Sequence, residues 1–314
     1  MKKTVFNLLN IYSFIVFILA LITIFTELKQ YTFSQLIESL KQIPLNKVFL
    51  CFLFAFLSYA LLTIYENSAL EYIGHKLNFL KVALVSFIDD AFSNNIGFST
   101  LSAASIQYHL YSKWGLTAKE ISKVVGFIFL TSWLGYFTLA GITFLIEPIS
   151  IPQVMNIPLR SVRPIGAILI IPVVFCFLLC CLRKKPIHLK NSVISIPSFS
   201  LLSKVTFISL VDWVLCGASL YSVLPDTNIT FPTFLAVYLL AEMAGFLSRV
   251  PSGFGVVETI ILVVMSSKVV SSEILVALIV FRIIYNVMPL LTASILFGLR
   301  EALEISEKVN KHGE

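Results

Sequence analysis

Apolar residues in this chain occur in long runs rather than in the short periodic patterns of water-soluble helices and strands. A hydrocarbon core about 30 Å thick needs about 20 helical residues to cross it. Six runs meet that length and predict an all-α, polytopic membrane protein with about six full spans: Leu8–Phe25, Val48–Leu70, Val124–Ile146, Ile165–Leu182, Val205–Leu224 and Ile274–Leu299.

Two further apolar stretches are interrupted by polar and helix-breaking residues. One runs from about Phe79 to Tyr111 and the other from about Phe231 to Met265. Each holds roughly 35 residues, or about 50 Å of continuous helix. Each stretch can therefore enter the membrane and return as a re-entrant hairpin, or cross once with a long tail.

The distribution of basic residues distinguishes these two arrangements, because cytoplasmic loops of membrane proteins are enriched in Lys and Arg. With two re-entrant hairpins, 15 basic residues fall on the cytoplasmic side and 6 outside, whereas two single crossings give 9 and 12. The hairpin arrangement is favoured. It places both termini, the region near Lys113 and Arg183–Lys190 in the cytoplasm, and it places Arg160 and Lys268 outside.

This topology divides the chain into two repeats of one design, 1–155 and 156–314. Each repeat contains two spans, a hairpin (about 79–111 or about 231–265) and a further span. Short matches at offsets of 154 and 153 residues support it, between Ala91-Phe92 and Gly245-Phe246 and between 118–121 and 271–274. Because the second repeat starts from the opposite face, the sequence predicts an inverted repeat, a common transporter design.

The region before the second span carries two further signals. Lys2 and Lys3 precede the first run, but no small-x-small cleavage site follows it, so we expect an uncleaved first helix. The segment Tyr31–Leu40 is polar and weakly amphipathic, which is typical of a helix lying in the membrane interface.

Composition narrows the function classes. Hydrophobic residues make up 58% of the chain and charged residues 13%, against about 25% charged in globular proteins. This excludes a soluble enzyme and a nucleic-acid-binding module. The five cysteines lie in apolar runs and are interpreted as small buried residues. No phosphate-binding loop, metal-binding motif or nucleophile elbow is present, so we expect no cofactor, no metal and no enzymatic activity.

Candidate functional residues lie in the two broken stretches. Ionisable groups at membrane depth cost about 2.5–3.5 kcal/mol each on insertion scales, and helix breaks there must be buried in protein or line a wet cavity. The ionisable candidates are Asp89, Asp90, Glu242, Arg249, Glu258 and Arg282. The predicted hairpin turns hold Asn94, Asn95, Gly97, Pro251, Gly253 and Gly255.

Two interpretations of the ionisable set stay open. The residues can pair with one another as salt bridges, with Glu242 or Glu258 as the partner of Arg249. Alternatively they line a polar cavity where Arg249 and the Asn94-Asn95 turn hold a phosphate, and the acids attract a cationic headgroup or carry protons. His109 is either a headgroup contact or part of an interfacial cluster with its neighbouring tyrosines. Asp212 is expected near the cytoplasmic interface rather than at the centre of its span.

Three segments together resemble the lysylphosphatidylglycerol synthetase transmembrane-region family. They are residues 91–99 (AFSNNIGFS), 111–116 (YSKWGL) and 251–258 (PSGFGVVE). The family includes bacterial inner-membrane proteins and the flippase half of the multiple peptide resistance factor, so the resemblance implies a plasma-membrane protein that translocates a phospholipid. Family members often carry an arginine where this chain has Gln107, which weakens a phosphate contact there. The domain that aminoacylates the lipid has no counterpart in these segments.

The sequence therefore predicts a phospholipid flippase or lipid-transport component of the bacterial inner membrane, acting passively or with a coupling ion. Its expected partner is a membrane phospholipid with an anionic or aminoacylated headgroup. Two other classes stay open: a membrane enzyme acting on a lipid or polyprenyl carrier, and a non-transporting regulator of an envelope enzyme. A second copy of the chain or such an enzyme is a further possible partner.

Overall fold

The structure is a computed structural model, and it describes residues 33–95, 99–151, 160–182, 187–189, 192–194, 196–226, 228–266 and 268–312. In chain order the elements are α2 (Phe33–Lys41), α3 (Leu45–Ile73), α4 (Phe79–Ser93), α5 (Ser99–Ser112), α6 (Ala118–Ile146), α7 (Arg163–Leu182), β1 (Ile187–Leu189), β2 (Ser192–Ile194), α8 (Phe199–Val223), α9 (Phe231–Ser248), the 3₁₀ turn η2 (Pro251–Gly253), α10 (Val256–Met265), α11 (Ser271–Arg282), the π-helix η3 (Ile283–Val287) and α12 (Met288–His312).

The all-α class is confirmed, apart from one short hairpin in which β1 pairs antiparallel with β2. Within the described residues, six helical stretches are long and apolar enough to cross a membrane: α3, α6, α7, α8, α9 and Ser271–Leu303. Five of them coincide with predicted spans. The predicted span Leu8–Phe25 lies outside the described residues, and so does Tyr31 at the start of the predicted interfacial segment, most of which forms α2.

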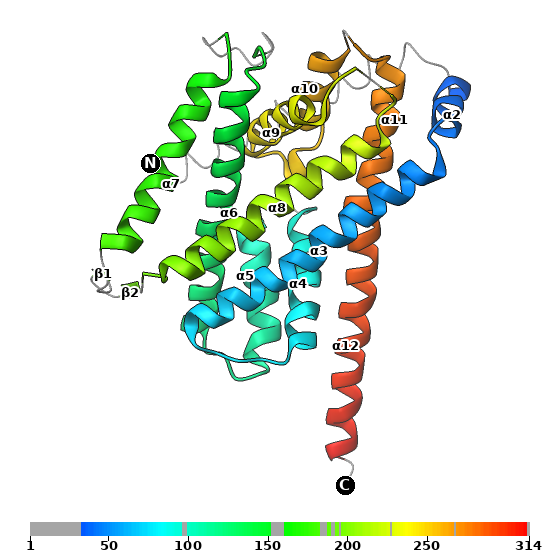
Figure 1. Cartoon of the computed structure of the whole chain (residues 1–314). Coiled ribbons are helices and arrows are strands. Elements are labelled where there is room, and N and C mark those ends of the chain that lie inside the picture. The colour runs from blue at the N-terminus through cyan, green and yellow to red at the C-terminus, as the bar shows by residue number, and fades with distance from the viewer. Residues whose placement is uncertain are drawn as a thin grey trace, which may run out of the picture.

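Each of the two interrupted stretches divides into two helices that pack against each other, α4 with α5 and α9 with α10. Figure 1 shows the first pair in one half of the molecule and the second pair in the other half. The break in α4–α5 begins at Asn94, as predicted. α9 alone has 18 residues and is long enough to cross a membrane. Re-entrance of the two pairs therefore stays a proposal.

Helix ends follow local sequence signals. α4 begins where Asn78 accepts a hydrogen bond from the Leu80 N–H (2.9 Å). α6 begins with a reciprocal capping box between Thr117 and Glu120. α3 ends at Gly74, whose φ of +76° favours glycine. These caps satisfy backbone groups that a helix end leaves without partners.

The long helices α3 and α8 pack side by side through the centre of the molecule, and they run antiparallel (Figure 1). Lys47 near the start of α3 donates to the carbonyl of Leu224, just after α8 (3.1 Å). At the other end, Lys204 pairs with Glu71 (Nζ to Oε2, 3.2 Å). α6 packs against α7 and α8, and α12 packs against α4.

Large apolar side chains are buried in this core and also cover its outer surface. Tyr111, Tyr136, Phe144 and Phe234 are among the largest fully buried side chains. Exposed apolar residues lie along α3, α7 and α12 among others, which is the surface that a lipid environment accepts.

Three pairs of equivalent helices in the two predicted repeats start 152–154 residues apart. α8 starts 154 residues after α3, α9 starts 152 after α4, and α11 starts 153 after α6. The spacing matches the 153–154-residue offsets of the sequence. In the repeat hypothesis, the central antiparallel pair α3–α8 consists of two equivalent helices.

Candidate functional site

A five-residue π-helix, η3 (Ile283–Val287), interrupts the last membrane-crossing stretch. Its cause is readable in the sequence, because Pro289 lacks an N–H and its ring clashes with the carbonyl four residues earlier, that of Tyr285. The Met288 N–H bonds to the carbonyl of Ile283, five residues back. π-helical turns are rare and frequently lie at functional sites.

Arg282, the last residue of α11 and the residue directly before the π-helix, holds the turn of the second helix pair. The Arg282 Nε donates to Glu258 Oε1 (2.7 Å), and its two terminal nitrogens donate to the hydroxyl (2.9 Å) and the carbonyl (3.2 Å) of Ser252. The Arg282 and Glu258 side chains are 17% and 7% exposed. Arg282 therefore joins α11, the η2 turn and α10 in one buried ion pair.

Glu258 also caps the helix that it begins. Its Oε2 accepts the N–H of Gly255, the residue before α10 (2.7 Å). The turn between α9 and α10 contains four residues with positive φ: Arg249, Ser252, Gly253 and Gly255. Both glycines of the predicted turn thus have positive φ, which glycine adopts without steric cost.

The turn of the first helix pair is hydrogen-bonded to the same π-helix, at Asn286. The Asn95 side-chain amide donates to the carbonyls of Ala91 (2.7 Å) and Asn286 (3.2 Å). In return, the Asn286 amide donates to the carbonyl of Asn94 (3.4 Å). The two helix breaks, far apart in sequence, thus contact positions 282 and 286 of one helical segment.

Tyr285 connects this segment to the central pair α3–α8. Its hydroxyl is hydrogen-bonded to Ser58 Oγ (2.8 Å) and to Cys216 Sγ (2.8 Å), and its carbonyl accepts the hydroxyl of Tyr59 (3.1 Å). Ser58 donates to Asp212. The prediction that Asp212 lies nearer the interface is wrong, because α8 extends from Phe199 to Val223 and Asp212 lies midway along it.

A second polar cluster lies where α3, α4 and α5 meet. The Gln107 Nε2 donates to Asp89 Oδ2 (2.9 Å) and to Glu66 Oε2 (3.4 Å), and the Tyr111 hydroxyl donates to Glu66 Oε1 (2.7 Å). All four side chains are buried. The neighbouring Asp90 accepts a hydrogen bond from Ser86 (3.0 Å).

Two predicted site residues lie at the surface. Arg249 is exposed at the end of α9 and forms no ion pair with any residue that the structure describes. The alternative interpretation that pairs Arg249 with Glu258 does not hold, because Arg282 is the ion-pair partner of Glu258. His109 is exposed and bonds to Glu301 (2.8 Å), which also pairs with Lys113 (2.7 Å).

The remaining predicted residues lie in the second helix pair, in its turn or outside the described residues. Glu242 lies in α9 and interacts electrostatically with Arg282 and Glu258. Pro251 lies in the η2 turn. Gly97 lies outside the described residues. Sequence reasoning missed Glu66, Tyr285 and Asn286, although an acid inside the predicted span Val48–Leu70 and a proline inside the last span were both visible signals.

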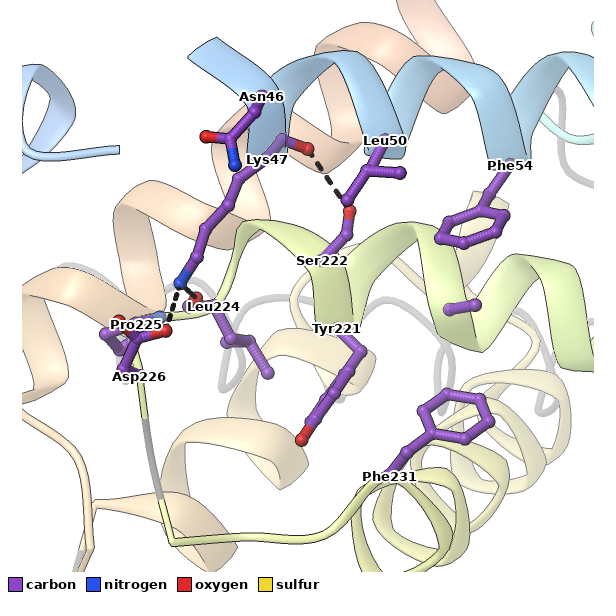
Figure 2. Close-up of a pocket in the computed structure, with 11 residues that line it drawn as sticks. Asn46, Lys47, Leu50, Phe54, Tyr221, Ser222, Leu224, Pro225, Asp226 and Phe231 are labelled. Carbon is purple, nitrogen blue, oxygen red and sulfur yellow. Dashed lines mark hydrogen bonds and ion pairs between the residues drawn. The ribbon is translucent and has the colours of Figure 1, made fainter. Parts of the chain in front are cut away.

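A cavity of about 590 Å³ lies away from this polar centre, between the start of α3, the end of α8 and the start of α9 (Figure 2). Lys47 reaches along one side of it and pairs with Asp226 (2.6 Å). The hydrogen bond from the Lys47 ammonium holds the pKa of the Asp226 carboxyl below its usual value. Phe54, Tyr221 and Phe231 supply an aromatic wall.

These features define a multi-pass membrane protein in which two broken helix pairs meet on a π-helix. Residues 10–293 match the family described as Lysylphosphatidylglycerol synthase TM region, and the chain belongs to that family.

Three relatives illustrate its range. Uncharacterized protein slr0712 of Synechocystis sp. is 33% identical over 290 residues, covering 92% of this chain and 90% of that protein. Inner membrane protein YbhN of Escherichia coli is 31% identical over 248 residues, covering 78% and 77%. Phosphatidylglycerol lysyltransferase of Staphylococcus haemolyticus is 24% identical over 303 residues, which cover 94% of this chain but only 34% of that protein. The chain therefore spans about a third of the lysyltransferase.

Proposed function

We propose that this protein translocates phospholipids between the leaflets of a bacterial inner membrane. The observation that carries the proposal is the convergence of two helix breaks and a buried Arg282–Glu258 pair on one π-helix. Broken helices with polar residues at membrane depth mark the substrate sites of many transporters. The membership of the family, and the names of relatives that act on phosphatidylglycerol or lie in an inner membrane, support a lipid as the substrate.

The two halves of the chain, 1–155 and 156–314, act in this proposal as an inverted repeat whose broken pairs enter from opposite faces. The 152–154-residue spacing of the three pairs of equivalent helices supports it. Both termini lie in the cytoplasm, consistent with the distribution of Lys and Arg. A rocking of one repeat against the other then exposes the polar centre to each leaflet in turn.

The two arginines near the turn of the second pair have different roles in this proposal. All three donor nitrogens of Arg282 are engaged by Glu258 and Ser252, so this residue holds the turn. Arg249 is exposed beside the same turn and has no ion pair with a described residue. Its guanidinium is therefore available to form two parallel hydrogen bonds to a lipid phosphate.

The test uses purified protein in liposomes that carry fluorescent phospholipids, with quenching of outer-leaflet lipid as the readout and protein-free liposomes as the control. Arg249→Gln should slow translocation about tenfold or more, because a charge-assisted hydrogen bond contributes about 1.5–3 kcal/mol. Arg249→Lys should lie between this variant and the wild type, since a fork becomes a point charge. Arg163→Gln removes an exposed arginine at the start of α7 and is the matched control.

Wild-type speed in Arg249→Gln would remove the phosphate role of this residue. Absence of translocation by the wild-type protein would overturn the proposed function itself. Chemical conversion of the added lipid would then identify a membrane enzyme. If the lipid is neither moved nor converted, the result favours a regulator of another envelope protein.

A further inference from the structure

Asp89 of the first helix pair and its neighbour Glu66 of α3 lack the ion-pair partner that Glu258 has in the second pair. Among the described residues, no Lys, Arg or His nitrogen forms an ion pair with Glu66 or Asp89. Their side chains nevertheless lie in the interior, with residue exposures of 4% and 5%. An ionised carboxylate buried without a cation is costly, and the usual outcome is that it takes up a proton.

Geometry brings the two carboxyl groups to one donor. Oxygens of both lie within 3.4 Å of a single nitrogen, Gln107 Nε2. Two carboxylates that share one site rarely ionise together, because each charge opposes the other. One proton held between them removes half of the negative charge and leaves one carboxylate to accept from the amide.

The other end of the same amide provides an independent observation. Gln107 is 1% exposed, and its Oε1 is a buried acceptor with no hydrogen-bond partner in the described structure. Buried acceptors without partners are rare in native proteins. A protonated carboxyl group is a donor, so an amide turned by 180° would place Oε1 beside the two acids, where one of them in its protonated form donates to it.

The surrounding groups add further negative charge. On α4, Asp90 lies beside Asp89 and interacts electrostatically with Glu66 and with Asp212 of α8. From α5, Tyr111 donates to Glu66.

We infer that Glu66 and Asp89, bridged by Gln107, form a proton-binding site that loads and releases one proton in each transport cycle. A carboxylate takes the proton from hydronium on one side of the membrane, leaving water, and returns it to water on the other side. No further reactant is needed. Asp89 lies on α4 just before its break, so a movement of the first helix pair changes the surroundings of the site. The coupling role rests on the proposed lipid translocation.

Coupling is tested in the same liposomes with an imposed pH difference. If one proton moves with each lipid, a difference of one pH unit shifts the steady-state leaflet ratio about tenfold, and a protonophore abolishes the shift. In Asp89→Asn the ratio should stay equal at any pH difference. Glu71→Gln, an exposed acid on the same helix as Glu66, is the matched control and should keep the wild-type shift.

Infrared spectroscopy of the purified protein tests the site without reference to transport. The wild type should show a carboxyl C=O band that persists at neutral pH, where exposed acids are ionised. Part of that band should disappear in the double variant Asp89→Asn, Glu66→Gln. In Gln107→Arg the added cation replaces the proton, so the same part of the band and the pH-driven shift should both be lost while the protein stays folded.

The possible results separate the two proposals. An unchanged band in the double variant overturns the proton site. If the band decreases in the double variant but the wild-type leaflet ratio does not change with the pH difference, the proton is structural. That result overturns the coupling. Absence of lipid movement by the wild type refutes the proposed function and the coupling, and the infrared titration then decides the proton site alone.

Discussion

The two broken helix pairs bury acids in different ways. In the second pair, Glu258 has a guanidinium partner in Arg282, and the same arginine fixes the turn through Ser252. Asp89 of the first pair and its neighbour Glu66 of α3 are hydrogen-bonded to the Gln107 amide and the Tyr111 phenol, and neither has an ion-pair partner among the described residues. The turn of the second pair is therefore held by an ion pair, whereas we infer that the Glu66–Asp89 site at the first pair changes its charge by one proton.

The largest loss of stability is expected from breaking the Arg282–Glu258 ion pair at the turn of the second helix pair. Arg282→Gln leaves Glu258 buried without its cation, and loss of one partner of a buried pair costs about 3–5 kcal/mol. Adding Glu258→Gln should restore much of that stability. Thermal unfolding in detergent measures both variants in a double-mutant cycle, with Arg163→Gln as the exposed control. Independent, additive losses would show that the two side chains do not depend on each other.

A smaller effect is expected at the turn itself. Gly253 has φ +59°, and an added Cβ meets Val257 Cγ2 at 2.9 Å and the Gly245 Cα at 3.2 Å. Gly253→Ala should therefore cost about 2 kcal/mol, mostly from the left-handed backbone. Gly126→Ala, in a regular helix with open space around the added Cβ, should be neutral or stabilising. Equal unfolding temperatures for the two variants would contradict the clamped turn.

The smallest effect is expected in the first pair. Asn95→Ala removes the amide that bonds to Ala91 and Asn286. Because neutral hydrogen bonds contribute about 0.5–1.5 kcal/mol each, the loss should be about 1–2 kcal/mol. Asn46→Ala, at an exposed position near the start of α3, should change stability by less than about 0.5 kcal/mol. A loss at Asn95 as large as that at Arg282 would remove the distinction between the two pairs.

The features that sequence predicted well are those set by local composition. Long apolar runs predicted five of the membrane-crossing helices. The positions of both helix breaks were predicted from Pro251, Gly253 and the Asn94-Asn95 pair, because proline and glycine disfavour a continuous helix. α9 was predicted as half of a hairpin, yet it has the length of a span. Length and charge alone do not decide how far a helix continues before its turn.

The partners within the site were less predictable, because they depend on packing between helices distant in sequence. Arg249 and Arg282 are both basic residues in apolar surroundings, and only the path of the chain places Arg282 beside Glu258 and Arg249 at the surface. Glu66 was visible as an acid inside the apolar run Val48–Leu70, but its partners on α4 and α5 were not. Pro289 was a visible signal, since a proline within a long helix frees a carbonyl four residues earlier.

The antiparallel pairing of α3 with α8 has a consequence for how the protein is made. Ser58 bonds to Asp212 across 154 residues of sequence and to Tyr285 across 227. During synthesis α3 leaves the ribosome before α8 and the last membrane-crossing stretch are made. Its polar side chains therefore lack their hydrogen-bond partners until residues 156–314 have been synthesised. The native core closes only when Ser271–Leu303 inserts. A nascent chain halted before that segment therefore presents unpaired polar groups to lipid, and these are a natural signal for membrane chaperones and quality-control proteases.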